Sequence, residues 1–135
     1  MRVVFDSNVV ASGVGWDGEA YLCLVQLAHR RAIAYGSDVT LNEARETCVR
    51  LIQELKFSHH AASRLNWYLS AVKRVEPVPL GKQRSRDVKD DPYLAVAMAA
   101  RARIIVSYDK DLLDLEKPFG IDIVRPARFL QLIRG

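Results

Sequence analysis

Cysteine is scarce in this chain, because Cys23 and Cys48 are the only two among its 135 residues. Both lie in segments with helical periodicity, and their separation matches no metal-binding or redox motif. We therefore expect them to be buried thiols in a protein of the reducing cytoplasm.

Long apolar runs, repeats and low-complexity tracts are also missing from the sequence. No apolar run is long enough to span a bilayer, so we expect no membrane partner. The early Asp6 interrupts any apolar core of a signal peptide. No linker divides the chain, which favours a single domain over residues 1–135 that buries a core without disulfides or metal ions.

The charged residues are distributed unevenly, although the formal net charge of +4 is modest. The acids gather at residues 87–91 and 109–111, and the neighbouring bases are Lys82, Arg84, Arg86 and Lys89. An enzyme that acts on nucleic acid needs both kinds, since acids hold a metal ion and bases hold phosphates. Solvated surface loops would explain the same two runs, so the charge pattern alone leaves both interpretations open.

Short β-branched segments predict a set of buried strands. These segments are Val3–Phe5, Ile33–Tyr35, Ile104–Val106 and Ile121–Val124. Val75–Leu80 contains Pro77 and Pro79 and can be an edge strand at most. Helical periodicity predicts helices at about residues 19–32, 44–55, 61–72, 92–102 and 127–133. The alternation indicates an α/β fold in which helices cover both faces of a short, mostly parallel sheet.

Four acids stand at positions that such a sheet would bring together. Asp6 directly follows the first predicted strand, and Asp109 lies three residues after the strand Ile104–Val106. Glu43 and Asp91 stand near the starts of two predicted helices. Doubly wound sheets bind ligands beyond the carboxyl ends of their strands, and helix N-termini face the same edge. All four carboxylates can therefore meet in one pocket.

Each of these acids also has a purely structural interpretation. The segment Thr40–Glu43 matches a capping box, and Asp91 before Pro92 matches an N-cap followed by proline. Asp6 can cap the turn after its strand, and Asp109 can begin a type I turn. None of these interpretations requires the four acids to meet.

A cluster of carboxylates needs a compensating cation, because like charges raise one another's pKa values. Oxygen ligands without histidine or cysteine suit Mg²⁺ or Mn²⁺. Such an ion lowers the pKa of a bound water, positions a phosphate and stabilises charge on the leaving oxygen. These are the requirements of phosphodiester hydrolysis.

The ordered motifs resemble those of PIN-domain nucleases over nearly the whole chain. The motifs are Asp6-Ser7-Asn8 after a short strand, Glu43 early in a helix, DDPYLAVA from Asp90 and IVSYDKDLL from Ile105. The chain is most similar to the VapC-like toxins of toxin–antitoxin systems. The resemblance implies a three-layer PIN-like fold and a metal-dependent endoribonuclease that is paired with a small antitoxin protein and is often a homodimer.

The resemblance also implies roles for individual residues. The catalytic acids are Asp6, Glu43, Asp91 and Asp109, of which Asp6, Asp91 and Asp109 bind the metal ion. The supporting residues are Asn8, which orients Asp6 or a water, Ser107, which stands where threonine is common, and Asp111, which assists a second metal or a water. The charge pattern, and not the resemblance, makes Lys82, Arg84 and Arg86 candidate contacts to RNA phosphates, with a solvated loop as the alternative.

Two features depart from the family's pattern. The third acid stays open among Asp87, Asp90 and Asp91, because the chain offers three candidates within five residues. Tyr108 stands where glycine or a basic residue is common, which narrows access to the pocket.

Two further functions compete with the nuclease. An aspartyl phosphotransferase would use Asp6 as its nucleophile, but that chemistry usually wants an acid two residues later, where this chain has Asn8. A catalytically inactive PIN-like module would bind RNA or a protein without cutting it. The presence of an acid at all four positions argues against an inactive module.

Overall fold

The computed structural model describes residues 1–57, 59–85 and 88–134 of the chain. Arg86, a predicted RNA contact, and Asp87, a candidate third acid, lie outside the described residues. Within them, five parallel strands form one sheet in the order β3-β2-β1-β4-β5. The strands are β1 (Arg2–Phe5), β2 (Ile33–Gly36), β3 (Lys73–Arg74), β4 (Ile104–Val106) and β5 (Asp122–Val124).

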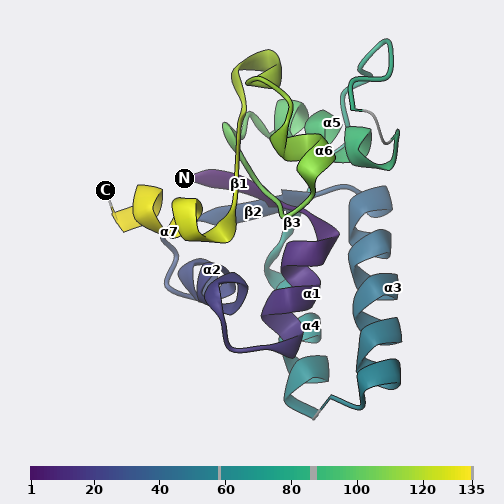
Figure 1. The fold of residues 1–135 in the computed structure, drawn as a ribbon, viewed down its shortest axis with the longest axis vertical. Coiled ribbons are helices and arrows are strands. Elements are labelled where there is room, and N and C mark those ends of the chain that lie inside the picture. The colour runs from purple at the N-terminus through teal and green to yellow at the C-terminus, as the bar shows by residue number, and fades with distance from the viewer. Residues whose placement is uncertain (58, 86–87, 135) are drawn as a thin grey trace.

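Helices cover both faces of this sheet (Figure 1). They are α1 (Ser7–Gly15), α2 (Glu19–Ala28), α3 (Asp38–Leu55), α4 (His59–Ala71), α5 (Asp91–Ala100), α6 (Lys110–Leu113) and α7 (Pro126–Arg134), with 3-10 turns η1 (Val88–Asp90) and η2 (Pro118–Gly120). In the described part of the chain, no helix is both long enough and apolar enough to cross a membrane.

Successive residues of the central strands belong to two separate apolar cores. Val3 and Phe5 pack with residues of α1, α2, α3, α4 and α7, whereas Val4 packs with residues of α5 and α6. Ile105 of β4 joins Val4 in the second core. In Figure 1, α5 and α6 lie above the sheet and α1 to α4 lie below it. The predicted three-layer α/β fold with a parallel sheet is therefore confirmed.

The strand order creates a switch point between β1 and β4. The chain adds β2 and β3 on one side of β1, and then returns to place β4 and β5 on its other side. The register pairs Phe5 with Val106, so both central strands end together. The crevice beyond such paired carboxyl ends is where doubly wound sheets bind their ligands.

The helix α1 is the longest element that the sequence patterns did not predict, and the short helix α6 is another. The valines of α1 are β-branched and have a modest helix propensity. Val9, Val10 and Val14 are nevertheless almost fully buried, and their packing outweighs that propensity. Gly15 permits a close approach, because an added Cβ would lie 2.5 Å from the Phe57 ring. Tertiary contacts thus decide the structure of this segment.

The edge of the sheet also differs from the prediction. The edge strand is β3, Lys73–Arg74, and not Val75–Leu80. The Val75 N–H still donates to the Gly36 carbonyl at 2.9 Å. The pairing ends soon afterwards, because the prolines in that segment have no N–H to donate.

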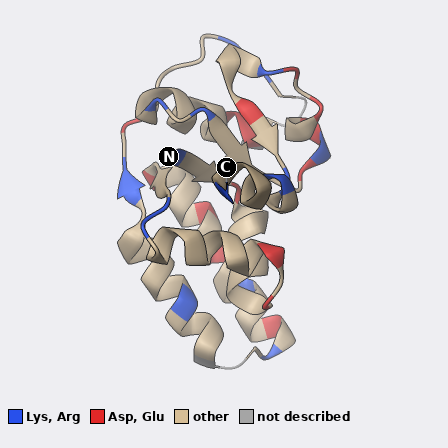
Figure 2. Cartoon of the chain, turned by 90° about the vertical axis from the view of Figure 1, so that its left-hand side faces the viewer, with Lys and Arg blue, Asp and Glu red and all other residues tan. Residues whose placement is uncertain are grey.

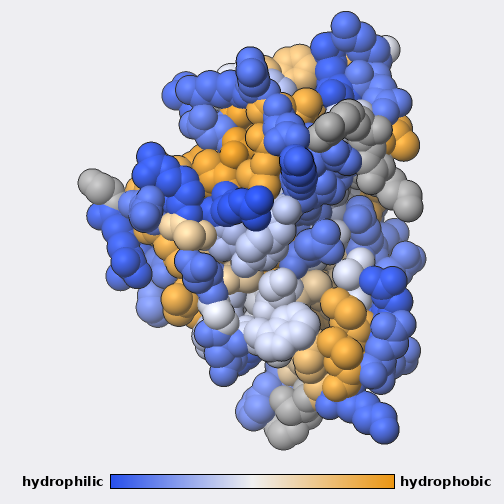
Figure 3. Space-filling view, in the orientation of Figure 1, coloured by the Kyte–Doolittle hydropathy of each residue, from blue (hydrophilic) through white to orange (hydrophobic). Residues whose placement is uncertain are grey.

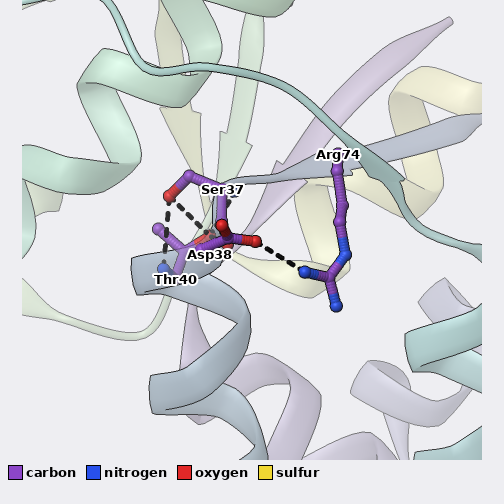
Figure 4. Close-up of polar contacts among 4 residues, drawn as sticks. All are labelled: Ser37, Asp38, Thr40 and Arg74. Carbon is purple, nitrogen blue, oxygen red and sulfur yellow. Dashed lines mark hydrogen bonds and ion pairs between the residues drawn. The ribbon is translucent and has the colours of Figure 1, made fainter.

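The start of α3 is fixed by a capping box between Ser37 and Thr40 (Figure 4). The Ser37 hydroxyl accepts the Thr40 N–H at 3.3 Å, and the Thr40 hydroxyl accepts the Ser37 N–H at 2.9 Å. Asp38 pairs with Arg74 of the edge strand beside this cap. The helix therefore begins earlier than the predicted Thr40–Glu43 box, which leaves the Glu43 side chain free for another role.

Both thiols are buried, as the sequence predicted. Burial raises the pKa of Cys23 and that of Cys48 to about 12, so both stay protonated at neutral pH. The outer surface is mainly hydrophilic on the face that Figure 3 shows, with a few separate apolar patches.

Candidate active site

Asp6 lies at the switch point, directly after β1. Its backbone N–H donates to the Val106 carbonyl of β4 at 3.0 Å, which fixes it at the carboxyl ends of both central strands. Its carboxylate is buried, with 3% of the residue exposed, and makes no capping hydrogen bond to α1. The Ser107 hydroxyl donates to its Oδ2 at 2.7 Å. Asp6 thus occupies the N-cap position of α1, but its side chain does not cap the helix.

The electrostatic surroundings of Asp6 disfavour its charged form. Burial raises its pKa most, and the nearby charges of Glu43 and Asp109 raise it further. Hydrogen bonds from Ser107 and from the Ser7 backbone act in the opposite direction but do not cancel the rise. A buried carboxylate in this setting gains stability from any cation that enters the pocket.

Glu43 projects from the second turn of α3 toward the same pocket. The Ser7 hydroxyl donates to its Oε1 at 3.0 Å, and the Tyr93 hydroxyl donates to its Oε2 at 2.9 Å. The Tyr93 oxygen in turn accepts the Ser7 N–H at 3.3 Å. The Glu43 carboxylate thus ties α3 to α1 and α5, and it does not cap its own helix.

Tyr93 is a site residue that the sequence reasoning missed. It is 1% exposed, and burial together with the nearby Asp6 and Glu43 charges raises the pKa of its hydroxyl well above the usual range. The hydroxyl is therefore a neutral donor at any ordinary pH. In the sequence, Tyr93 stands in an apolar stretch after Pro92, and its hydroxyl is the one polar side-chain group there. A tyrosine in such a stretch is easily assigned to the core.

Asp109 begins α6 and also faces other acids. The Asp109 N–H donates to the Ser107 hydroxyl at 2.9 Å, and Asp109 Oδ1 accepts the Asp111 N–H at 2.8 Å. One carboxylate oxygen each from Asp90, Asp109 and Asp111 lies within 4.8 Å of the other two. This spacing lets three oxygens approach one cation after small side-chain rotations.

Asp90 and Asp91 are adjacent in sequence but point in different directions. Both Asp91 oxygens accept backbone N–H groups, from Arg84 at 2.8 Å and from Ser85 at 2.7 Å. Asp90 is 4% exposed, and burial followed by the charge of Asp109 raises its pKa to about 7. The structure therefore brings Asp90 to Asp109, whereas the sequence favoured Asp91.

Asn8, which the sequence assigned to orient Asp6, is exposed on α1. In the part of the chain that the structure describes, its side chain makes no hydrogen bond to Asp6. Ser107, a predicted supporting residue, makes that contact instead. Asp111, the other predicted supporting acid, lies in a group with Asp90 and Asp109.

The predicted RNA-binding residues have different surroundings. Lys82 is exposed, and Arg86 lies outside the described residues. Arg84 is half-buried, its guanidinium lies 4.9 Å from the centre of the Phe119 ring, and it donates to the Leu80 carbonyl at 3.2 Å. Arg84 therefore holds loops together, and Lys82 is the more accessible of the two described bases.

The pocket has the composition of a site for a hard divalent cation. Its donors are carboxylate and hydroxyl oxygens, and no histidine or cysteine belongs to the acidic group in the described residues. Burial, and then the charges of neighbouring acids, raise the pKa values of Asp6 and Asp90, so their charged forms are disfavoured when no cation is present. Mg²⁺ and Mn²⁺ fit this donor set and would stabilise those charged forms.

Comparisons with known proteins agree with this fold. The sequence profile of the family described as PIN domain matches residues 2–111. The solved structure titled "Crystal structure of PAE2754 from Pyrobaculum aerophilum" superposes with a TM-score of 0.65. That likeness covers 100% of this chain and 91% of the other at 21% sequence identity, which establishes similarity of fold alone. None of the curated proteins matches the sequence.

Proposed function

Because this chain belongs to the PIN domain family, we propose that it is a metal-dependent endoribonuclease that hydrolyses phosphodiester bonds of RNA. The family implies a nuclease-type enzyme that acts on nucleic acid, and RNA is the more specific substrate that we propose. The observation that carries the proposal is the group of oxygens from Asp90, Asp109 and Asp111 beside the buried Asp6. The proposed cofactor is Mg²⁺ or Mn²⁺.

We assign the third catalytic acid to Asp90 in place of Asp91. Asp90 is buried against Asp109, while Asp91 has both oxygens engaged by backbone N–H groups. The proposed metal ligands are therefore Asp6, Asp90 and Asp109, with Asp111 close enough to hold a water or a second ion. Asp91 instead anchors the segment that carries Ser85, whose hydroxyl donates to Asp90 at 3.2 Å.

The remaining site residues orient these acids and the attacking water. Ser107 fixes the rotamer of Asp6, and Tyr93 and Ser7 fix that of Glu43. Each Glu43 oxygen retains a lone pair, with which the carboxylate can orient a water in line with the phosphorus atom. A bound divalent ion would lower the pKa of that water and stabilise the leaving oxygen.

Cleavage of a fluorescent single-stranded RNA by the purified protein tests this proposal. We expect cleavage with Mg²⁺ or Mn²⁺, none with a chelator, and a loss in Asp6→Asn that exceeds the roughly 100-fold effect of changes outside the metal ligands. The Asp6→Asn protein should fold, because the substitution relieves repulsion. Failure of the folded wild-type protein to cut any RNA would favour an inactive PIN-like binding module.

A role as the toxin of a toxin–antitoxin pair is the more specific biological proposal. It is supported by the family membership and by the order of the motifs. A small antitoxin protein would silence the cytoplasmic enzyme by inserting an arginine that pairs with Asp6 and Asp109, since a guanidinium matches carboxylates bidentately. A homodimer is the proposed assembly.

Expression in the native host tests the toxin role. The wild-type protein should arrest growth, Asp6→Asn should not, and co-expression of a short neighbouring gene should restore growth and yield a stable complex. Harmless expression of an enzyme that cuts RNA in vitro would point to a housekeeping nuclease instead.

A further inference from the structure

A polar hollow lies at the opposite ends of the strands from the acidic group. It has a volume of about 520 Å³ and is formed by the end of α5, the starts of β4 and β5, and the η2 turn. Arg103 directly precedes β4, and Asp122 begins β5, so the hollow faces the amino ends of these strands. The acidic pocket lies at their carboxyl ends.

The charged side chains around this hollow are mainly cationic. Arg101, Arg103 and Lys117 line it with a single acid, Asp122. Lys117 pairs with Asp122 at 3.6 Å, but both side chains are more than half exposed, so the pair contributes little. Across the described residues, neither arginine makes an ion pair or a side-chain hydrogen bond. Two guanidinium groups are therefore available to an anion.

Two arginines without an acidic partner line this hollow together. Figure 2 shows basic positions spread over several elements of the molecule, mixed with acidic ones. Some cations elsewhere pair with nearby acids, as Arg64 does with Asp17 and Arg74 does with Asp38. At the hollow, Arg101 and Arg103 stand two positions apart, and neither has such a partner in the part of the chain that the structure describes.

Several residues around the hollow have an unfavourable backbone conformation. Arg101, Lys117 and Phe119 all have a left-handed conformation, with φ values of 55°, 48° and 55°. A residue with a Cβ pays roughly 1–2 kcal/mol in that region, where glycine would be relaxed. Arg101 ends α5, where this conformation is common, but Phe119 lies within η2 and keeps an apolar ring that is 47% exposed.

Arg84 connects this hollow to the acidic pocket. Its backbone N–H is held by Asp91, and the next residue, Ser85, contacts Asp90. Its guanidinium reaches the Phe119 ring at the rim of the hollow. The helix α5 begins at Asp91 and ends just before Arg101, and its ten residues span about 15 Å. A few nucleotides of single-stranded RNA can cover that distance.

We propose that the hollow is an accessory RNA site, which binds the phosphodiester backbone of the segment that flanks the cleaved bond. Arg101 and Arg103 contact the phosphates, for which planar guanidinium groups are suited, and Phe119 offers an apolar ring at the rim for a base. This inference rests on the proposed nuclease function, because it requires that RNA is the substrate.

The test compares RNA binding by two charge-reversed variants, both built on the non-cleaving Asp6→Asn protein. One carries Arg101→Glu and Arg103→Glu. The matched control carries Arg50→Glu and Lys56→Glu, two exposed residues near the end of α3 that lies farthest from the sheet (Figure 1). Both variants change the net charge equally, so a difference between them reports position and not total charge.

Fluorescence anisotropy of a labelled single-stranded RNA at several salt concentrations gives the result. We expect the Arg101 and Arg103 variant to bind at least tenfold more weakly than the control. We also expect its salt dependence to be shallower by about 0.7 in log–log slope for each lost phosphate contact. Equal affinities of the two folded variants would overturn the accessory site alone. Lack of RNA binding by the Asp6→Asn parent, together with lack of cleavage by wild type, would overturn the nuclease proposal as well.

Discussion

The Ser107 hydroxyl donates a hydrogen bond of 2.7 Å to Asp6 Oδ2, across 101 positions of sequence. The contact follows from the pairing of Phe5 with Val106, which ends β1 and β4 side by side at the switch point of the sheet. Asp6, with its buried carboxylate, directly follows β1. Ser107, whose hydroxyl donates to that carboxylate, directly follows β4. The parallel pairing of two short apolar strands thus builds the floor of the proposed metal site.

Asparagine substitutions at Asp90 and Asp91 should have different effects. Asp90→Asn should remove metal-dependent cleavage and weaken Mn²⁺ binding by more than about 100-fold, because a proposed ligand is lost. Asp91→Asn should mainly lower the free energy of unfolding, because the backbone N–H groups of Arg84 and Ser85 lose part of their acceptor. Isothermal titration with Mn²⁺ and chemical denaturation measure the two effects. Stronger loss of Mn²⁺ binding in Asp91→Asn would restore Asp91 as the third acid.

Tyr93→Phe should reduce catalysis although it removes a single oxygen atom. The Glu43 carboxylate loses its donor at Oε2 and is no longer held in one orientation. Loss of a residue that orients an acid typically costs about 10–100-fold in activity or metal affinity. Tyr68→Phe is the control, since Tyr68 is equally buried but lies in the core on the other face of the sheet. Equal rates for both variants would show that Tyr93 only fills space.

The stability of the metal-free protein should fall as the pH rises. The pKa of Asp90 is raised from the usual 3.8 to about 7. Between these values the folded protein keeps a proton that the unfolded chain has released, so the free energy of unfolding decreases with increasing pH. Asp6, whose pKa is also raised, acts in the same direction.

Thermal melting at about pH 5 and pH 8 in the presence of a chelator measures this dependence. The melting temperature should be several degrees higher at the lower pH, and Asp90→Asn should flatten the difference. Saturating Mg²⁺ should stabilise the protein at the higher pH, because the cation offsets the repulsion. A metal-free protein that becomes more stable from pH 5 to pH 8 would contradict the raised pKa values of these buried acids.

Ser37→Ala should destabilise the fold by about 1 kcal/mol, because it removes the side-chain cap of α3. The matched control is Arg74→Ala, which removes the exposed pair with Asp38 beside the same helix end (Figure 4). That pair should contribute less than about 1 kcal/mol. Urea denaturation of both variants measures the difference, and a larger effect of Arg74→Ala would show that the cap does not fix the helix start.

The fold was predictable where local pattern and burial agree. Ile104–Val106 is a run of three β-branched residues, and all three are buried. Continuous apolar runs of this kind are typical of strands inside a parallel sheet, which is covered on both faces. The helix α1 was not predictable, because its valines favour strands locally and only packing beneath the sheet makes them helical. The sequence placed the edge strand at Val75–Leu80, after its true position at Lys73–Arg74. Prolines indicate where strand pairing must stop, but they do not indicate where it begins.

The candidate site was predictable in position but not in detail. Asp6 and Asp109 follow two neighbouring parallel strands, and this is enough to predict where the site lies. The prediction does not depend on the rotamers of the two side chains. The choice between Asp90 and Asp91 depends on direction, since adjacent residues at a helix start point about 100° apart. The role of Glu43 was obscured by a matching capping motif, whereas the structure caps α3 with Ser37. Tyr93 was hidden by its apolar neighbours.

Anomalous diffraction from crystals of the protein soaked in Mn²⁺ tests the central claim most directly. The account predicts a peak bound by the carboxylates of Asp90 and Asp109, within reach of Asp6, and its loss in crystals of Asp90→Asn. A peak bound elsewhere, or no peak at a saturating Mn²⁺ concentration, would contradict the assignment of the acidic pocket as the metal site of a nuclease.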